Sequence, residues 1–306
     1  MIYSDVIAQL QKNDSLLDWE DLQKTAVSII NEKPRAIRLP GVIAGCYQSV
    51  SDRVVAVSTS LAVAFSGIVL LDDVLDGDFR FGKPGPEIAN MSAGLFALMN
   101  EIVVGASQDP QMILMGQAIL NRLVFNVSLG QSLDVQNPET EEGYWQVAAL
   151  KSGAFFEGVF QLGGLAGGAA RGDLQVLGEL GREYGLLLQI HDDLRDVLET
   201  PANSDWVNGR FSLPILFAHL VEHPERERFE TIRTQVQDPE LLAEAQAILL
   251  RCGAISYGLY QIEEHYQVVP PLLSQLTARE VTPIDDLFRE LVEPVQSMVE
   301  SLNPAG

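Results

Sequence analysis

The stretch VVAVSTSLAVAFSGIVLLDDVLDGD, residues 54–78, starts as a run of apolar and small residues and ends in a cluster of aspartates. Its apolar part, residues 54–71, is just long enough to be considered as a membrane span. Hydroxyl side chains interrupt this run and no excess of basic residues flanks it, which favours a buried helix of a soluble protein. A helix that is apolar on every side belongs at the centre of a fold. We therefore predict a core helix with carboxylates at its end, and no transmembrane segment.

A second apolar run ends in the same pattern. In GLLLQIHDDLRDVLET, residues 185–200, Asp192, Asp193 and Asp196 repeat the i, i+1, i+4 spacing of the aspartates that begin at Asp72. Like charges at i, i+4 destabilise a helix by about 0.2–0.5 kcal/mol per pair, so two such clusters call for a compensating cation. Carboxylate oxygens suit Mg²⁺, which commonly bridges a protein to the phosphates of its substrate.

Helix geometry orients the first cluster. Asp72 and Asp76 lie about 40° apart around a helix and about 6 Å along it, so both face the same way. Asp73 is displaced by about a quarter turn and is expected to meet a neighbouring side chain or solvent. Two such acidic faces predict Mg²⁺ around a diphosphate at the mouth of an apolar cavity. A metal-bound diphosphate is a good leaving group, and a cavity poor in water protects the carbocation that it leaves.

The composition excludes several classes of partner. With 42 acidic and 20 basic residues, the 306-residue chain has a formal charge of −22, which repels phosphate backbones and anionic lipids. We expect no nucleic-acid partner. Two isolated cysteines, Cys46 and Cys252, provide neither a disulfide framework nor a zinc site, and the first residues lack the pattern of an export signal. These features predict a cytoplasmic protein.

Helical periodicity dominates the chain, so the predicted fold is all-α. Short Gly, Pro and Asn breaks, among them LPG at 39–41, separate the helices, and none resembles a linker, so residues 1–306 are expected to form one domain. GGLAGG, residues 163–168, follows no strand and is interpreted as small residues that let helices pack closely, not as a phosphate loop. Helices are expected at 3–32, 52–78, 86–107, 110–135, 139–170, 174–199, 211–222, 238–266 and 283–303.

The two acidic clusters resemble the two aspartate-rich motifs of the trans-polyprenyl diphosphate synthase family, a group of class I isoprenoid synthases. Supporting segments are similar to further signatures of the family: Gly130-Gln131 with Asp134, Lys151-Ser152, and DWVNGRFSLP at 205–214. The resemblance implies an all-α orthogonal helical bundle of the isoprenoid synthase type around a central apolar cavity. It also implies a homodimer and three Mg²⁺ ions.

The resemblance assigns roles to particular residues. Asp72 and Asp76 would ligate two ions, and Asp192, with Asp196, the third. Lys151, Gln189, Arg80 and Arg210 would belong to the site of the allylic diphosphate. Asp72, Asp76, Asp192 and Lys151 would be the catalytic residues.

A chain-elongating member of the family also binds isopentenyl diphosphate, and the corresponding residues are altered here. The basic segment at 34–40 keeps Arg35 and Arg38 but has no lysine. Phe65 stands at the position of a histidine, Phe81 at that of a second arginine, and Ser204 at that of a lysine. Each charge-assisted contact is worth about 1.5–3 kcal/mol, so two losses weaken binding roughly a hundredfold or more.

The residues before the first motif indicate the depth of the cavity. Phe65 lies about 20° from Asp72 around the helix and is expected to face the cavity, where its ring could shield a cation. Gly67 and Ile68 carry no aromatic side chain, and Ala64 and Leu61 continue that face. If the family's pattern holds, a chain of fifteen or twenty carbons fits there.

The shared step implied is Mg²⁺-dependent ionisation of an allylic prenyl diphosphate, and three acceptors of the cation stay open. The altered isopentenyl site leads us to prefer a terpene-synthase-like reaction of the substrate with itself, without isopentenyl diphosphate. Arg35 and Arg38 favour chain elongation with isopentenyl diphosphate. Transfer to an indole or peptide acceptor is the third alternative, because residues 252–257 are similar to those of peptide-modifying relatives. A non-catalytic partner subunit is disfavoured because both acidic motifs are intact.

Overall fold

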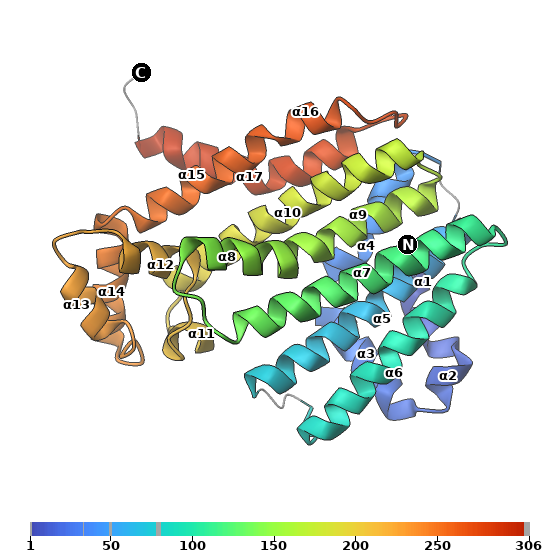
Figure 1. Cartoon of the computed structure of the whole chain (residues 1–306), viewed down its shortest axis with the longest axis horizontal. Coiled ribbons are helices and arrows are strands. Elements are labelled where there is room, and N and C mark those ends of the chain that lie inside the picture. The colour runs from blue at the N-terminus through green and yellow to red at the C-terminus, as the bar shows by residue number, and fades with distance from the viewer. Residues whose placement is uncertain (1, 33, 49–50, 78–80, 303–306) are drawn as a thin grey trace.

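The protein is built from helices packed side by side, as predicted (Figure 1). The computed structural model describes residues 2–32, 34–48, 51–77 and 81–302, and no strand occurs in these ranges. The elements are α1 (Ile2–Lys12), α2 (Asp14–Leu17), α3 (Glu20–Glu32), α4 (Pro34–Gly45), α5 (Ser51–Asp76), α6 (Gly85–Val104), α7 (Pro110–Asp134), α8 (Glu141–Ala148), the π-helical turn η1 (Ala149–Gly153), α9 (Ala154–Gly167), α10 (Arg171–Leu198), α11 (Ser204–Val207), α12 (Leu213–Leu220), α13 (Arg226–Ile232), α14 (Pro239–Arg251), α15 (Ala254–Gln267), α16 (Val269–Leu273) and α17 (Thr282–Leu302).

Two of the predicted helices are divided. The helix expected at 3–32 breaks at Asn13, whose side chain accepts a hydrogen bond from the N–H of Leu16 and caps α2. The helix expected at 238–266 breaks between α14 and α15 at Gly253, which has a φ of 88°. A left-handed backbone of this kind is available to glycine without strain.

The segment LPG, expected to be a break, lies inside α4 instead. Proline in a helix removes a backbone donor, so local preference opposes this helix. Tertiary packing outweighs that preference. A Cβ atom built at Gly163 of α9 would lie 2.9 Å from the carbonyl oxygen of Pro40, which shows how closely the two helices approach.

The glycines of α9 allow this approach. A Cβ atom at Gly167 would lie 2.8 Å from the carbonyl oxygen of Ala44, and one at Gly164 would lie 2.3 Å from the side chain of Leu177 on α10. Gly168, with a φ of 79°, ends the helix. The interpretation of GGLAGG as a close-packing segment is confirmed.

The central helix is α5, which contacts α1, α3, α4, α6, α7 and α9. Judged only by length and composition, α5, α6 and α7 could each cross a membrane. In the protein, 72% of the apolar window of α5 is buried, against 44% for α6 and 28% for α7. The burial of α5 agrees with the prediction of a core helix.

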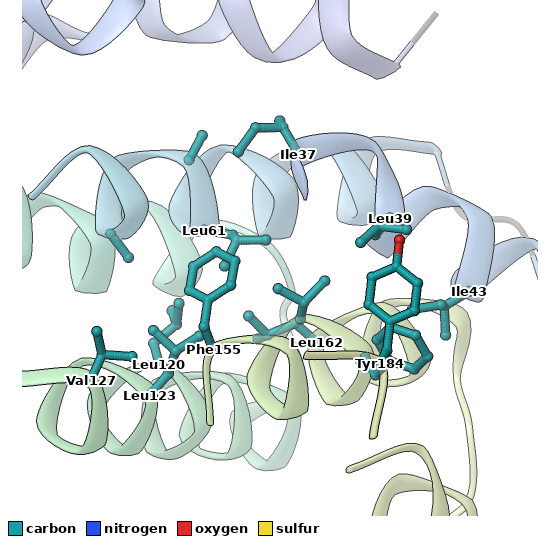
Figure 2. Close-up of a cluster of buried hydrophobic side chains, with 14 of the residues drawn as sticks. Ile37, Leu39, Ile43, Leu61, Leu120, Leu123, Val127, Phe155, Leu162 and Tyr184 are labelled. Carbon is teal, nitrogen blue, oxygen red and sulfur yellow. The ribbon is translucent and has the colours of Figure 1, made fainter. Parts of the chain in front are cut away.

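The apolar side of α5 packs against the middle of the bundle. Leu61 has no exposed surface, and it lies beside Phe155 of α9 in the cluster of Figure 2. Ala64 is also fully buried. The face that was expected to line a prenyl cavity is thus covered by side chains in this structure.

Candidate active site

A cavity of about 470 Å³ lies where the ends of α5, α7 and α10 meet η1 and residues 203–212. Its volume falls within the range of about 300–1,000 Å³ that is usual for ligand sites. Both acidic clusters contribute to its wall. The aspartates that line it are Asp72, Asp76, Asp134, Asp192, Asp193, Asp196 and Asp205.

Two cations reach the first cluster from elsewhere in the chain. Nζ of Lys151 lies 2.6 Å from Oδ2 of Asp134 and 3.9 Å from Oδ1 of Asp72. Arg210 donates through Nη2 to Oδ1 of Asp76 at 3.1 Å and through Nη1 to the carbonyl oxygen of Asp134 at 2.7 Å. The first cluster is therefore paired with two other segments of the chain, and both cations also bind Asp134 at the end of α7.

Lys151 does not offset the effect of burial on the pKa of Asp72. Burial raises the pKa of Asp72 to about 6, although Lys151 opposes the shift, and the nearby Asp76 and Asp134 raise the pKa further. An additional cation beside Asp72 would lower its pKa again.

The donor set fits a hard divalent ion. No group of three His, Cys, Asp or Glu side chains in the described ranges is arranged to hold a metal ion alone. Carboxylates that contribute only one or two ligands each suit Mg²⁺, which keeps waters and takes further oxygens from phosphates.

In the second cluster the central acid has a structural role. Asp193 is 6% exposed and accepts hydrogen bonds from Oη of Tyr144 at 2.8 Å, Nε2 of Gln189 at 2.9 Å and the N–H of Leu213 at 2.7 Å. Burial raises the pKa of Asp193 to about 6 against the effect of these bonds. Asp193 therefore fixes α8, α10 and the start of α12 relative to one another.

Gln189 connects this network to the lysine. Its Oε1 accepts a hydrogen bond from Oγ of Ser152 at 2.7 Å, next to Lys151. Its side chain lines the cavity beside the acids.

Two glycines hold the turn that carries Lys151. A Cβ atom at Gly130 of α7 would lie 2.9 Å from Leu150, and one at Gly185 of α10 would lie 2.3 Å from the carbonyl oxygen of Ser152. Any larger side chain at either position would displace η1. The turn is π-helical, a form that is frequent at functional sites.

The segment after α11 is held by Asn137. This residue has a φ of 49°, donates to the carbonyl oxygen of Gly209 at 3.1 Å and accepts from the N–H of Phe211 at 3.1 Å. On the other side, the guanidinium of Arg233 lies 4.6 Å from the centre of the Phe211 ring. Together these contacts set the position of Arg210.

The family model for polyprenyl synthetases matches residues 23–249, about three quarters of the chain. The chain belongs to the polyprenyl synthetase family. It is accordingly an enzyme of the class I isoprenoid synthase type, with the all-α fold that was predicted.

Relatives and solved structures agree with this assignment. A short chain isoprenyl diphosphate synthase from Methanothermobacter thermautotrophicus is 30% identical over 72% of this chain and 73% of its own length. A geranylgeranyl diphosphate synthase from Methanosarcina mazei is 23% identical over 78% of both chains. Among solved structures, the geranylgeranyl pyrophosphate synthetase of Pyrococcus horikoshii has a TM-score of 0.79 at 21% identity, covering 95% of this chain and 94% of its own. The polyprenyl synthase of Caulobacter crescentus, complexed with calcium and isoprenyl diphosphate, has a TM-score of 0.76 at 17% identity, covering 96% and 92%.

Several residues predicted for the site of this polyprenyl synthetase lie away from the cavity. Arg35 pairs with Glu290 of α17 at 2.7 Å, and the guanidinium of Arg38 lies 5.4 Å from the centre of the Tyr3 ring. Arg80 lies outside the described residues.

Phe65 and Ile68, which precede the acids on α5, are half-buried against the apolar core. The ring of Phe65 lies 5.5 Å from that of Phe155, centre to centre. Ile68 is not among the residues that line the polar cavity. The structure therefore places both side chains on the apolar side of the site.

Sequence reasoning gave no role to Asn137, Tyr144, Asp205 and Arg195, which line the cavity of this polyprenyl synthetase. Asp205 lines the cavity, and burial raises its pKa despite the neighbouring Arg210. Arg195 could have been found, because it is the one basic residue inside either five-residue acidic motif. Asn137 and Tyr144 carry no such signal, since their role depends on contacts across the fold.

Proposed function

We propose that this protein is a trans-prenyltransferase that ionises an allylic prenyl diphosphate and extends it with isopentenyl diphosphate. The observation that carries the proposal is the cavity in which both acidic clusters meet Lys151 and Arg210. The names of the relatives, which are isoprenyl and geranylgeranyl diphosphate synthases, support elongation over a reaction without isopentenyl diphosphate.

The proposed roles follow from charge and position. Asp72, Asp76, Asp192 and Asp196 would hold Mg²⁺, with three ions in the proposed site. When bound, the ions neutralise the diphosphate and make it a leaving group. Lys151 and Arg210 would bind diphosphate oxygens, and their bonds to Asp134 hold both cations toward the cavity.

The reaction has a simple balance. The allylic C–O bond breaks, and its electron pair leaves with the diphosphate. The double bond of isopentenyl diphosphate then forms a new C–C bond to the allylic carbon, and the resulting cation gives a proton to the released diphosphate. The half-buried Phe65 and the apolar residues around it would keep water from the cation. Chains of fifteen or twenty carbons stay the proposed allylic substrates, although Leu61 and Ala64, from which this length was inferred, are buried in this structure.

A terpene-synthase-like reaction is the second candidate. Arg35 and Arg38 pair with Glu290 and Tyr3 and do not line the cavity, and Phe65 replaces a histidine. These observations weaken the case for an isopentenyl diphosphate site. They favour capture of the cation within the substrate itself.

One experiment separates the candidates. Purified protein and Mg²⁺ are incubated with farnesyl or geranylgeranyl diphosphate, with and without isopentenyl diphosphate, and the products are analysed by mass spectrometry. A longer diphosphate that forms only with isopentenyl diphosphate is the expected result. A hydrocarbon or alcohol formed without it would replace elongation by the second candidate. Diphosphate release that needs an added indole or peptide would point to another acceptor.

The same proposal includes one domain over residues 1–306, a cytoplasmic location, no nucleic-acid partner and a homodimer. Support for the dimer comes from α7, which exposes Leu114, Phe125 and Leu129, with Phe125 69% exposed. Light scattering should give twice the mass of one chain. Phe125→Asp should give the mass of one chain if α7 forms the contact.

A further inference from the structure

Arg195 forms ion pairs with two carboxylates of the second acidic cluster, Asp192 and Asp196. Its Nη1 lies 2.9 Å from Oδ1 of Asp192, its Nη2 lies 3.1 Å from Oδ1 of Asp196, and its Nε lies 3.3 Å from Oε1 of Glu199. The side chain is 61% exposed and lines the cavity. One guanidinium thus bridges the two acids that are proposed to bind metal.

The first cluster has no counterpart to this arginine. The five-residue motifs read DDVLD at 72–76 and DDLRD at 192–196, so Leu75 stands where Arg195 stands in the second. Leu75 is 51% exposed and contributes no charge. The cations near the first cluster, Lys151 and Arg210, belong to other elements and can also contact a bound diphosphate.

A guanidinium and a divalent ion compete for the same carboxylate oxygens. The ion pairs of Arg195 relieve the repulsion between Asp192 and Asp196, which are one helical turn apart. Coordination of a metal ion by Asp192 requires that Arg195 give up that carboxylate. Glu199 provides a third acid, to which the guanidinium is already close enough to remain bound.

We propose that Arg195 competes with the third metal ion for the carboxylates of Asp192 and Asp196. It neutralises the second acidic pair until metal ions enter with the diphosphate, and it then stays on Glu199. This inference rests on the proposed function, in which Asp192 and Asp196 are metal ligands. It adds that the second cluster binds free divalent ions more weakly than its two aspartates alone would.

The test measures Mn²⁺ binding by electron paramagnetic resonance of the free ion, with no substrate present. Arg195→Leu, which copies the residue of the first cluster, should tighten one Mn²⁺ site roughly fivefold, as expected for the loss of competing exposed ion pairs. Glu199→Gln should weaken the same site, because the guanidinium then has only the two aspartates. Unchanged or weaker Mn²⁺ binding by Arg195→Leu would overturn the proposal.

The matched control is Arg182→Leu. Arg182 lies on the same helix and pairs with Glu157 at 2.7 Å, away from the cavity. This variant changes the net charge by the same amount. An equal gain in Mn²⁺ affinity in both variants would show that the overall charge causes the effect, and would overturn the proposal. If Arg195→Leu does not fold, as judged by circular dichroism, Arg195→Gln removes the charge while keeping a polar side chain.

A second measurement separates this inference from the proposed function. Wild-type protein should take up Mn²⁺ with inorganic diphosphate, and Asp192→Asn should reduce that uptake. If wild type takes up none, or if Asp192→Asn changes nothing, the metal site fails and the inference fails with it. The metal site stands if Mn²⁺ uptake behaves as expected. If the double variant Arg195→Leu, Asp192→Asn then still binds Mn²⁺ as tightly as Arg195→Leu alone, only the proposed competition is wrong.

Discussion

The two acidic clusters have the same spacing but different surroundings. In the first, Asp72 and Asp76 face cations from η1 and from residue 210, which are distant in the chain. In the second, Asp192 and Asp196 pair with Arg195 of their own helix. The central acids, Asp73 and Asp193, are both only 6% exposed. The comparison teaches that spacing fixes which acids share a face, whereas the partners of those acids depend on the rest of the fold.

The largest expected effect concerns catalysis. Asp72→Ala and Asp192→Ala should each lower the rate of diphosphate release by about 10²–10³-fold or more, since each removes stabilisation of the leaving group. Release is measured with a coupled diphosphate assay at saturating Mg²⁺. Asp286→Asn on α17, an exposed acid away from the cavity, is the control. Full activity in Asp192→Ala would break the functional equivalence of the clusters.

The next effect concerns stability and distinguishes acids within the second cluster. Asp193→Ala leaves the Tyr144 hydroxyl, the Gln189 amide and the Leu213 N–H without their acceptor, which should lower the free energy of unfolding by about 3 kcal/mol. Asp192→Ala should change it by no more than about 0.5 kcal/mol, because that acid is partly exposed. Urea unfolding followed by circular dichroism measures both. Equal losses would show that Asp193 has no special structural role.

The buried carboxyl of Asp193 should also make the stability of the protein depend on pH. The pKa of Asp193 in the folded protein is about 6, above its ordinary value of 3.8, so protonation favours the folded state. The stabilisation that comes from protonated Asp193 is fully present below pH 3.8, the pKa of this carboxyl in the unfolded chain. It is lost as the pH rises through 6, the pKa of Asp193 in the folded protein. Relative to Asp193→Asn, wild type should therefore gain about 1 kcal/mol between pH 7.5 and 5. Urea unfolding in EDTA at several pH values tests this, and a relative loss over that range would contradict the sign.

The smallest effect compares the cations. Arg210→Ala removes bonds to Asp76 and to the end of α7 from a partly buried site, which should lower the free energy of unfolding by about 1 kcal/mol. Arg195→Ala should cost no more than about 0.5 kcal/mol, because its pairs are exposed and local. Thermal unfolding at low and high salt measures both. A larger loss in Arg195→Ala would mean that the second cluster depends on its arginine for folding.

Much of the fold follows from periodicity. The long apolar runs of α5, α6, α7 and α10 were predicted to within a few residues, because their burial pattern is set along one helix. The helix α4 was missed, since Pro40 inside it opposes a helix and packing against α9, α5 and α1 outweighs that preference. Boundaries at Asn13 and Gly253 were missed because single capping residues are weak signals inside periodic segments.

The site was predictable where one motif carries it. The acids were found from their spacing, Lys151, Gln189 and Arg210 from the family resemblance, and all of them line one cavity. Arg35 and Arg38 were expected in the site from the resemblance of their segment to the family, but their partners lie on α17 and α1. Contacts of this kind join residues that are far apart in sequence, and no periodicity reports them.

The π-helical turn at Ala149–Gly153 sets the rotation of α9 relative to α8. A π turn contains one residue more than an α turn of the same extent, so α8 and α9 behave as one α-helix with a single inserted residue. Deleting one residue there would rotate every later side chain by about 100° relative to α8. Lys151 or Phe155 could then keep its direction, but not both. The placement of Lys151 in the cavity and of Phe155 beside Phe65 thus depends on a single residue in this turn.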